Sequence, residues 1–349
     1  MNNMDEKIFL KQLSEAHGPS GKEKWVHPLI EKAFQDCCNI KKDNVNNLYL
    51  TKEGTGKGKI MIMAHCDEVF LMVSEIIDKG YLKVKGTGID PKTLVSQKVL
   101  IHGYKKIEGI IGIKPPHLMN SDEREKAITI DEILVDTGYS KEELEKIVRV
   151  GDYITIKREM VELLNNNVAC KCADDRAGIV AMKCCLDEIK NINHELDVCF
   201  VASCQEETGI RGARVATANV MPDIGIAIDT TFDSGLLGDQ GRENKIGQGP
   251  VICIGPNIHP KVRKKIMSIA KEYNIPFQLE VEPGHTGTDA WNIQTVKEGV
   301  PTLLISIPIK HMHTSVELIN IDDIKNTGRL IAKFIEKLKD SELEELLCF

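Results

Sequence analysis

The sequence contains few aromatic residues, no long apolar run and no excess of positive charge. Phe, Trp and Tyr make up only 5% of the 349 residues. No apolar run approaches the roughly 20 residues of a membrane-spanning helix, so we expect no membrane partner. The net charge of −7 argues against a nucleic-acid-binding surface. These absences favour a soluble globular enzyme.

The N-terminus and the cysteines indicate a cytoplasmic protein. Residues 1–7 lack the basic and apolar regions of a signal peptide. The 11 cysteines are odd in number and follow no disulfide framework, which suits reduced thiols. Cys170 and Cys172 form a CxC pair, for which ordinary packing is favoured over metal binding or redox use.

The length and the order of predicted elements indicate two domains. A chain of 349 residues exceeds one ordinary core. Buried strands alternate with helices in residues 1–72 and 166–349, which predicts an α/β domain with a mostly parallel-type mixed sheet flanked by helices. Short β-like segments punctuated by glycine fill residues 73–165, so we expect a small β-rich domain inserted there.

Two adjacent acids follow the apolar run 198–203, which predicts a buried strand. Glu206 and Glu207 would therefore lie at the strand end, where open α/β sheets place their ligand crevices. Adjacent side chains of an extended segment point opposite ways, so one acid could bind a cation while the other handles protons. The alternative is a charged surface turn.

Other His and acidic residues occupy similar positions. His65 and Asp67 follow the predicted strand 60–64 and share a face, as a metal ligand and its orienting carboxylate would. Asp174 precedes a helical run, Asp229 follows a strand, and His313 follows the last strand. Strand ends of a parallel sheet converge in space. This donor set suits zinc, cobalt or manganese at a hydrolytic site. The alternative for Asp174 is a structural one, because the helix dipole stabilises an acid in the first turn of a helix.

Six segments, taken in order, resemble a known family. They are residues 64–73, 173–178, 205–213, 229–231, 287–290 and 313–317. With them the chain resembles the tetrahedral dinuclear-metal aminopeptidases, known as glutamyl or deblocking aminopeptidases and historically as endoglucanase M. The resemblance covers nearly the whole chain, and the insert lies where that family has one. No segment is decisive alone, but the ordered set is specific.

The resemblance implies a zinc-exopeptidase-like fold with two divalent metal ions per subunit. Zinc is the first choice, and cobalt or manganese are alternatives. Asp174 would bridge both metals. His65 and Asp229 would complete one site, and Glu207 and His313 the other.

The resemblance also assigns the catalytic groups. Glu206 would be the general base, and Asp67 would orient His65. A cis peptide bond is expected at Asp174–Asp175. The substrates would be short peptides trimmed from their amino terminus. The inserted domain would form dimers as building blocks of a homo-oligomer, with a tetrahedral dodecamer as the expected assembly.

Some positions depart from the family pattern, and alternatives stay open. Cys66 stands in a slot that is usually apolar, and Lys310 and His311 replace a common Arg-Tyr pair. The roles of these residues and of His285 stay undetermined, with substrate contact and packing both considered for the two histidines. A related carboxypeptidase or N-acyl amino acid amidohydrolase, and a non-catalytic metal-binding assembly protein, are the alternatives. The early insert and Glu206, respectively, argue against them.

Overall fold

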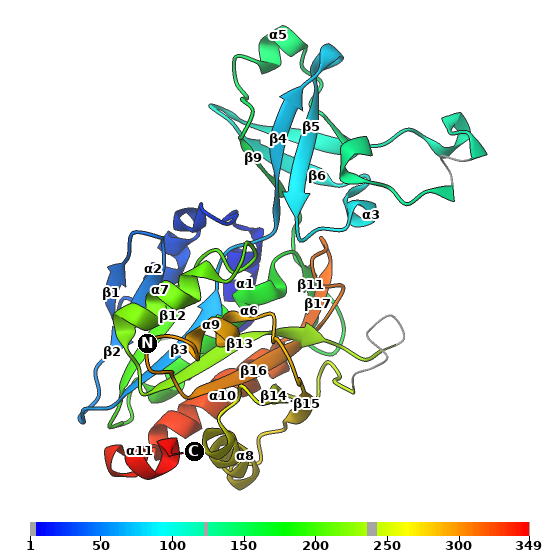
Figure 1. Ribbon diagram of the computed structural model, residues 1–349. Coiled ribbons are helices and arrows are strands. Elements are labelled where there is room, and N and C mark those ends of the chain that lie inside the picture. Colours follow the sequence, from blue (N-terminus) through cyan, green and yellow to red (C-terminus); the bar gives the residue numbers. More distant parts are fainter. Residues whose placement is uncertain (1–4, 122–124, 236–242, 349) are drawn as a thin grey trace. The chain divides into compact units, whose positions relative to one another are not determined.

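The computed structural model describes residues 5–121, 125–235 and 243–348 (Figure 1). Chain contacts divide it into two compact units. The first comprises Met1–Glu68, Met160–Met312 and Glu317–Phe349, and the second comprises Val69–Glu159 with His313–Val316. The expected boundary at 72/73 falls inside strand β4 (Phe70–Ile76), and the one at 165/166 lies beyond β10 (Val161–Glu162). Strand β10 pairs with the sheet of the first unit, so the insert is shorter than expected at this end.

One mixed sheet forms the centre of the first unit. Among the described residues it has eleven strands in the order β1-β2-β12-β3-β13-β16-β17-β11-β10, with β14 beside β16 and β15 beside β14. Besides β10, the strands are β1 (Asn39–Lys42), β2 (Leu48–Lys52), β3 (Lys59–His65), β11 (Asn167–Cys170), β12 (Asp197–Ser203), β13 (Ile224–Phe232), β14 (Val251–Ile254), β15 (Gln278–Val281), β16 (Thr302–Lys310) and β17 (Glu317–Asn320).

Parallel pairing is concentrated in the middle of this sheet. Strands β12, β3, β13 and β16 are parallel neighbours, and β14 is parallel to β15. The outer strands pair antiparallel, so the sheet is less parallel than the sequence predicted. Short connections such as the one between β1 and β2 explain this, because a hairpin joins only antiparallel strands. In β3, Ile60–Ala64 are fully buried, which requires cover on both faces of the sheet.

Helices supply that cover. Helix α6 packs against α1 and α10, and α7 packs against α9. Within the described ranges no helix is long and apolar enough to cross a bilayer. The helical elements of this unit are α1 (Glu6–Glu15), η1 (Glu23–Trp25), α2 (His27–Phe34), α6 (Ala173–Ile189), α7 (Arg211–Val220), α8 (Pro260–Glu272), α9 (Asp289–Ile293), α10 (Ile321–Lys337) and α11 (Asp340–Leu347).

The second unit is a closed antiparallel barrel with its own apolar core. Its strands run in the order β4-β5-β8-β7-β6-β9. Besides β4, they are β5 (Tyr81–Thr87), β6 (Lys98–His102), β7 (Lys106–Gly112), β8 (Leu134–Asp136) and β9 (Tyr153–Ile156), with the helical elements η2 (Asp78–Gly80), α3 (Pro91–Leu94), η3 (Pro116–Leu118), η4 (Ile130–Glu132) and α5 (Lys141–Leu144). Leu82, Val99 and Ile154 are among the buried residues that fill it. The structure therefore confirms a small β-rich insert in an α/β chain.

Candidate active site

The end of β3 places an imidazole between two carboxylates. His65 is the last residue of the strand, and it is buried together with Asp67 and Asp174. Its Nε2 atom lies 3.2 Å from Asp174 Oδ1, and its Nδ1 atom lies 3.5 Å from Asp67 Oδ1. Burial alone would lower the pKa of His65, but Asp174 and Asp67 outweigh burial and raise this pKa well above its usual value. Each ring nitrogen thus faces a different acid.

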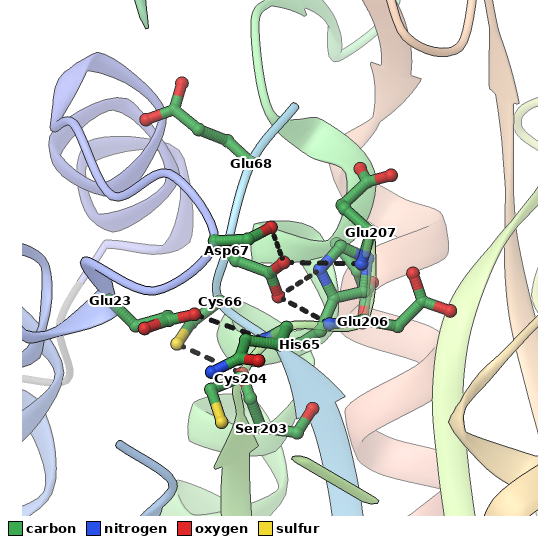
Figure 2. A network of polar contacts seen from close by, with 12 residues as sticks. Glu23, His65, Cys66, Asp67, Glu68, Ser203, Cys204, Glu206 and Glu207 are labelled. Carbon is green, nitrogen blue, oxygen red and sulfur yellow. Dashed lines mark hydrogen bonds and ion pairs between the residues drawn. The ribbon is translucent and has the colours of Figure 1, made fainter. Parts of the chain in front are cut away.

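Asp67 also fixes the turn that follows β12 (Figure 2). Its Oδ1 accepts a hydrogen bond from the Glu206 amide at 3.1 Å, and its Oδ2 accepts one from the Glu207 amide at 3.3 Å. The Ser20 hydroxyl donates to Oδ2 at 2.5 Å. The Glu pair lies in a turn rather than on the predicted extended segment, since Gln205 has a left-handed φ of 53°. The two Glu side chains nevertheless diverge.

Asp174 lies where α6 begins. The chain enters through Cys172, whose φ is 56°, and both Asp174 and Asp175 have non-helical backbone angles. The expected cis peptide bond joins these two aspartates. The Asp174 amide donates to Glu317 Oε2 at 3.2 Å. The Asp174 side chain is therefore presented from an irregular first turn rather than from a regular helix.

The predicted ligands gather in two groups. In the first, His65, Asp174 and Asp229 bring ligand atoms within 4.8 Å of one another. In the second, Asp174, Glu207 and His313 do the same. Asp174 belongs to both groups. Strand β13 is longer than predicted, so Asp229 lies inside it rather than after it.

Acids lie close together around these groups, and burial and mutual repulsion disfavour their charged forms. Burial, together with neighbouring acids such as Asp229, raises the pKa of Glu206 to about 11. Burial and nearby carboxylates likewise raise the pKa values of Asp175 and Asp229. Asp175 Oδ2 is buried and accepts no hydrogen bond among the described residues. A divalent cation would favour the charged forms of these acids, and imidazole with carboxylates is a donor set that suits zinc, cobalt or manganese.

A further acid, Asp289, was not assigned from the sequence. It is buried at the start of α9, and Ser203 Oγ donates to its Oδ2 at 2.5 Å. Burial raises the pKa of Asp289 to about 6. Its charge contributes to the raised pKa of Glu206, so it lies close to that group. In the sequence, the Gly-rich segment 284–287 just before a predicted helix was the feature that could have indicated a functional residue there.

A second unassigned feature is a buried ion network around Glu68. Lys171 Nζ lies 2.6 Å from Glu68 Oε2, and Arg176 Nη2 lies 3.3 Å from Oε1. Burial would raise the pKa of Glu68, but Lys171 and Arg176 lower it to about 2. The Cys172 thiol donates to Oε2 at 3.0 Å, and burial raises its own pKa. Both Cys170 and Cys172 are free, buried thiols.

Three residues whose roles the sequence leaves open are Cys66, His285 and His311. The Cys66 thiol is buried and donates to the Ser203 carbonyl at 3.2 Å, and burial raises the pKa of Cys66 well above its usual value. His285 is exposed and packs on Trp291, with ring centroids 4.2 Å apart. His311 is exposed, with a left-handed φ of 59°. His285 Nδ1 also accepts a hydrogen bond from the Gly287 amide at 2.9 Å.

Comparison with known proteins identifies the family. A model of the M42 glutamyl aminopeptidases matches residues 46–330. The chain belongs to the M42 family. A lysyl aminopeptidase of Pyrococcus furiosus is 38% identical to this M42 chain over 340 residues, which cover 95% of this chain and 97% of that protein.

Solved structures agree with this M42 assignment. An aminopeptidase of the archaeon Desulfurococcus kamchatkensis has a TM-score of 0.91 at 35% identity, covering 99% of this chain and 98% of that one. The TET1 peptidase of Pyrococcus horikoshii, which can assemble into a tetrahedron or a large octahedral shell, has a TM-score of 0.83 at 29% identity. That match covers 96% of this chain and 100% of that one. The family and the aminopeptidase class indicated by the six segments are confirmed.

Proposed function

We propose that this M42 enzyme is a dinuclear metal-dependent aminopeptidase that removes N-terminal residues from short peptides. One observation carries the proposal: Asp174 has ligand atoms within 4.8 Å of His65 and Asp229 in one group and of Glu207 and His313 in the other. A carboxylate has two oxygens, so one side chain shared by two such groups suits a bridging ligand.

Two divalent cations would be held by these five residues, with zinc as first choice and cobalt or manganese as alternatives. His65 and Asp229 would serve one cation, and Glu207 and His313 the other, with Asp174 between them. When bound, such a pair supplies Lewis acidity to the scissile carbonyl and lowers the pKa of the attacking water. Asp67 would keep the His65 ring oriented, as carboxylates commonly do for metal-ligating imidazoles.

Glu206 is the proposed general base. It is half-buried next to the ligand groups but belongs to neither. A pair of divalent cations at the ligand groups would favour the charged form of Glu206, the form that can accept a proton. Glu206 takes the proton of the attacking water and passes it to the leaving amine. The surplus of acids around it also favours a substrate that carries a cationic amino terminus.

We further propose that the barrel unit forms dimers that assemble into a tetrahedral dodecamer. The assembly ability of the Pyrococcus horikoshii relative supports this proposal. A cytoplasmic location is supported by the eleven cysteines, which follow no disulfide framework in the sequence.

The test compares metal-reconstituted wild type with Glu206→Gln on a panel of aminoacyl-anilides. The wild type should bind two divalent cations and hydrolyse some of the panel, whereas Glu206→Gln should lose about 10²–10⁴-fold in kcat while retaining metal. Glu188→Gln makes the same change at an exposed position of α6 and should behave as wild type. Turnover that survives in Glu206→Gln, or full metal content in a His65→Ala/His313→Ala double variant, would contradict the proposal.

A further inference from the structure

Asp67 and Glu68 are adjacent in the chain, yet their side chains point away from one another (Figure 2). Asp67 contacts the amides of Glu206 and Glu207. Glu68 instead contacts the segment that leads into α6. Both acids follow β3 directly. The end of this strand therefore contacts both the turn that carries Glu206 and Glu207 and the segment that carries Asp174.

The contacts of Glu68 bracket Asp174 in the sequence. Glu68 Oε2 accepts from Lys171 Nζ at 2.6 Å and from Cys172 Sγ at 3.0 Å, and both residues precede Asp174. Glu68 Oε1 accepts from Arg176 Nη2 at 3.3 Å, and Arg176 follows Asp174. One carboxylate therefore holds both sides of the irregular turn that presents Asp174.

The side chains of Lys171 and Arg176 also bind the carboxyl end of α1. Arg176 Nη1 donates to the carbonyls of Leu13 and Ala16, at 2.5 and 2.7 Å, and Lys171 Nζ donates to the Ala16 carbonyl at 2.9 Å. Cations at the carboxyl end of a helix are favoured by its dipole and satisfy its last carbonyls. Glu68 Oε1 also accepts from the Gly18 amide at 2.6 Å. The network therefore connects the end of α1 with the start of α6, and its three charged side chains are buried.

The backbone at Asp174 is not regularly helical. Asp174 and Asp175 both have non-helical backbone angles, between Cys172 and the regular part of α6. The position of Asp174 therefore also depends on side chains that contact the turn, among them Glu317, which accepts a hydrogen bond from the Asp174 amide. Glu68, Lys171 and Arg176 are buried to 2%, 2% and 0% exposure, respectively, so they can hold the turn without competition from solvent.

We propose that Glu68 is a positioning residue that holds the Asp174 turn in register with His65, through Lys171, Cys172 and Arg176. This inference rests on the proposed function, because it assigns Glu68 a role toward the two cations. Glu68 touches neither cation nor substrate in this scheme. Its effect is to fix where the shared carboxylate lies, so its loss should weaken cation binding as well as turnover.

A purely stabilising role is the competing explanation, and a double variant separates the two. Glu68→Gln leaves Lys171 and Arg176 as buried cations without a carboxylate partner, which destabilises the fold whatever Glu68 does for the site. Glu68→Gln/Lys171→Met removes the charges of Glu68 and Lys171, so only Arg176 stays without a carboxylate partner, and part of the thermal stability should return. It does not restore the grip on Arg176 and Cys172. The double variant also keeps the test valid if the single variant does not fold.

The experiment measures Zn²⁺ affinity by competition with a chromogenic chelator, together with thermal unfolding, kcat and KM. Relative to wild type, Glu68→Gln and the double variant should bind at least one Zn²⁺ about 10–100-fold more weakly. They should show a lower kcat with KM little changed. Asp323→Asn is the matched control. It alters a buried acid that accepts hydrogen bonds from the Gly247 and Gly249 amides and belongs to neither ligand group, and it should keep wild-type affinity.

Zn²⁺ affinity at the wild-type level in both Glu68 variants would overturn the positioning role, and so would a double variant that recovers affinity along with stability. Failure of the proposed function itself gives a different result. In that case the wild type would bind no pair of Zn²⁺ ions, and no variant would differ from it in binding.

Discussion

Asp67 Oδ1 accepts a hydrogen bond from the backbone amide of Glu206 at 3.1 Å, across 139 positions in the sequence. The same oxygen lies 3.5 Å from His65 Nδ1. A single carboxylate oxygen thus faces both a proposed metal ligand and the turn of the proposed base. We therefore expect a change at Asp67 to affect both the position of Glu206, the proposed base, and the binding of a cation by His65.

The first prediction concerns Asp67→Asn. The amide nitrogen of Asn cannot accept a hydrogen bond, so one contact to His65 or to the Glu pair is lost. We expect cation affinity or kcat to fall about 10–100-fold, as for other residues that orient metal ligands. Chelator competition and steady-state kinetics measure these quantities. Ser20→Ala, which removes only the hydroxyl donor to Asp67, should have a smaller effect. Equal effects of both variants would contradict this assignment.

The second prediction concerns protons released by cation binding. Burial raises the pKa of Glu206 to about 11, so the cation-free protein keeps a proton at this acid near neutral pH. Burial and nearby carboxylates raise the pKa values of Asp175 and Asp229 as well. Because a divalent cation favours the charged forms, binding should release protons, and affinity should rise with pH through the neutral range. Titration calorimetry in two buffers of different ionisation enthalpy counts the protons. A count of zero would show that the acids are already ionised.

The third prediction concerns Glu23. This buried side chain accepts hydrogen bonds from the amides of Gly21 and Gln205, at 2.6 and 3.2 Å. Burial, with a contribution from Asp67, raises the pKa of Glu23 from 4.5 to about 7. The folded state therefore binds the proton more tightly than the unfolded state. The resulting stability is present below pH 4.5 and is lost as pH rises through 7.

Glu23→Gln cannot titrate and should flatten this part of the stability profile. Between pH 4.5 and 7, cation-free wild type should lose on the order of 3 kcal/mol that the variant does not lose. Urea unfolding at several pH values in the presence of a chelator measures the difference. Parallel profiles for the two proteins would show that Glu23 has an ordinary pKa.

The sequence alone identified the α/β fold, the β-rich insert and the residues that form the two ligand groups. These features depend on local patterns. The run 60–64 is apolar because β3 is covered on both faces, and His65 and Asp67 follow it directly. Asp174 and His313 also entered as candidates from their places beside predicted elements, but their division between two metal sites came from the resemblance to a known family, since a single acid or imidazole carries little local information.

The Glu68 network and Asp289 were not predicted from the sequence, for a physical reason. A charged residue is normally exposed, so nothing in the sequence marked Glu68, Lys171 and Arg176 as a buried network. Their mutual contacts span more than a hundred positions, and pairings of this kind leave no periodic signal. The predicted extended geometry at Glu206 and Glu207 failed for a similar reason, because the left-handed Gln205 turn is not marked by a glycine at that position.

The parallel ladder of β3 and β12 pairs His65 with Ser203, residue for residue from Lys59 onward. Alternate residues of a strand face opposite sides, so deleting one residue within 60–64 would turn the side chains on one side of the deletion to the opposite face of the sheet. The spacing of the proposed metal ligands therefore depends on the number of residues in β3. Changes in chain length should be tolerated better in the loops between strands than within β3.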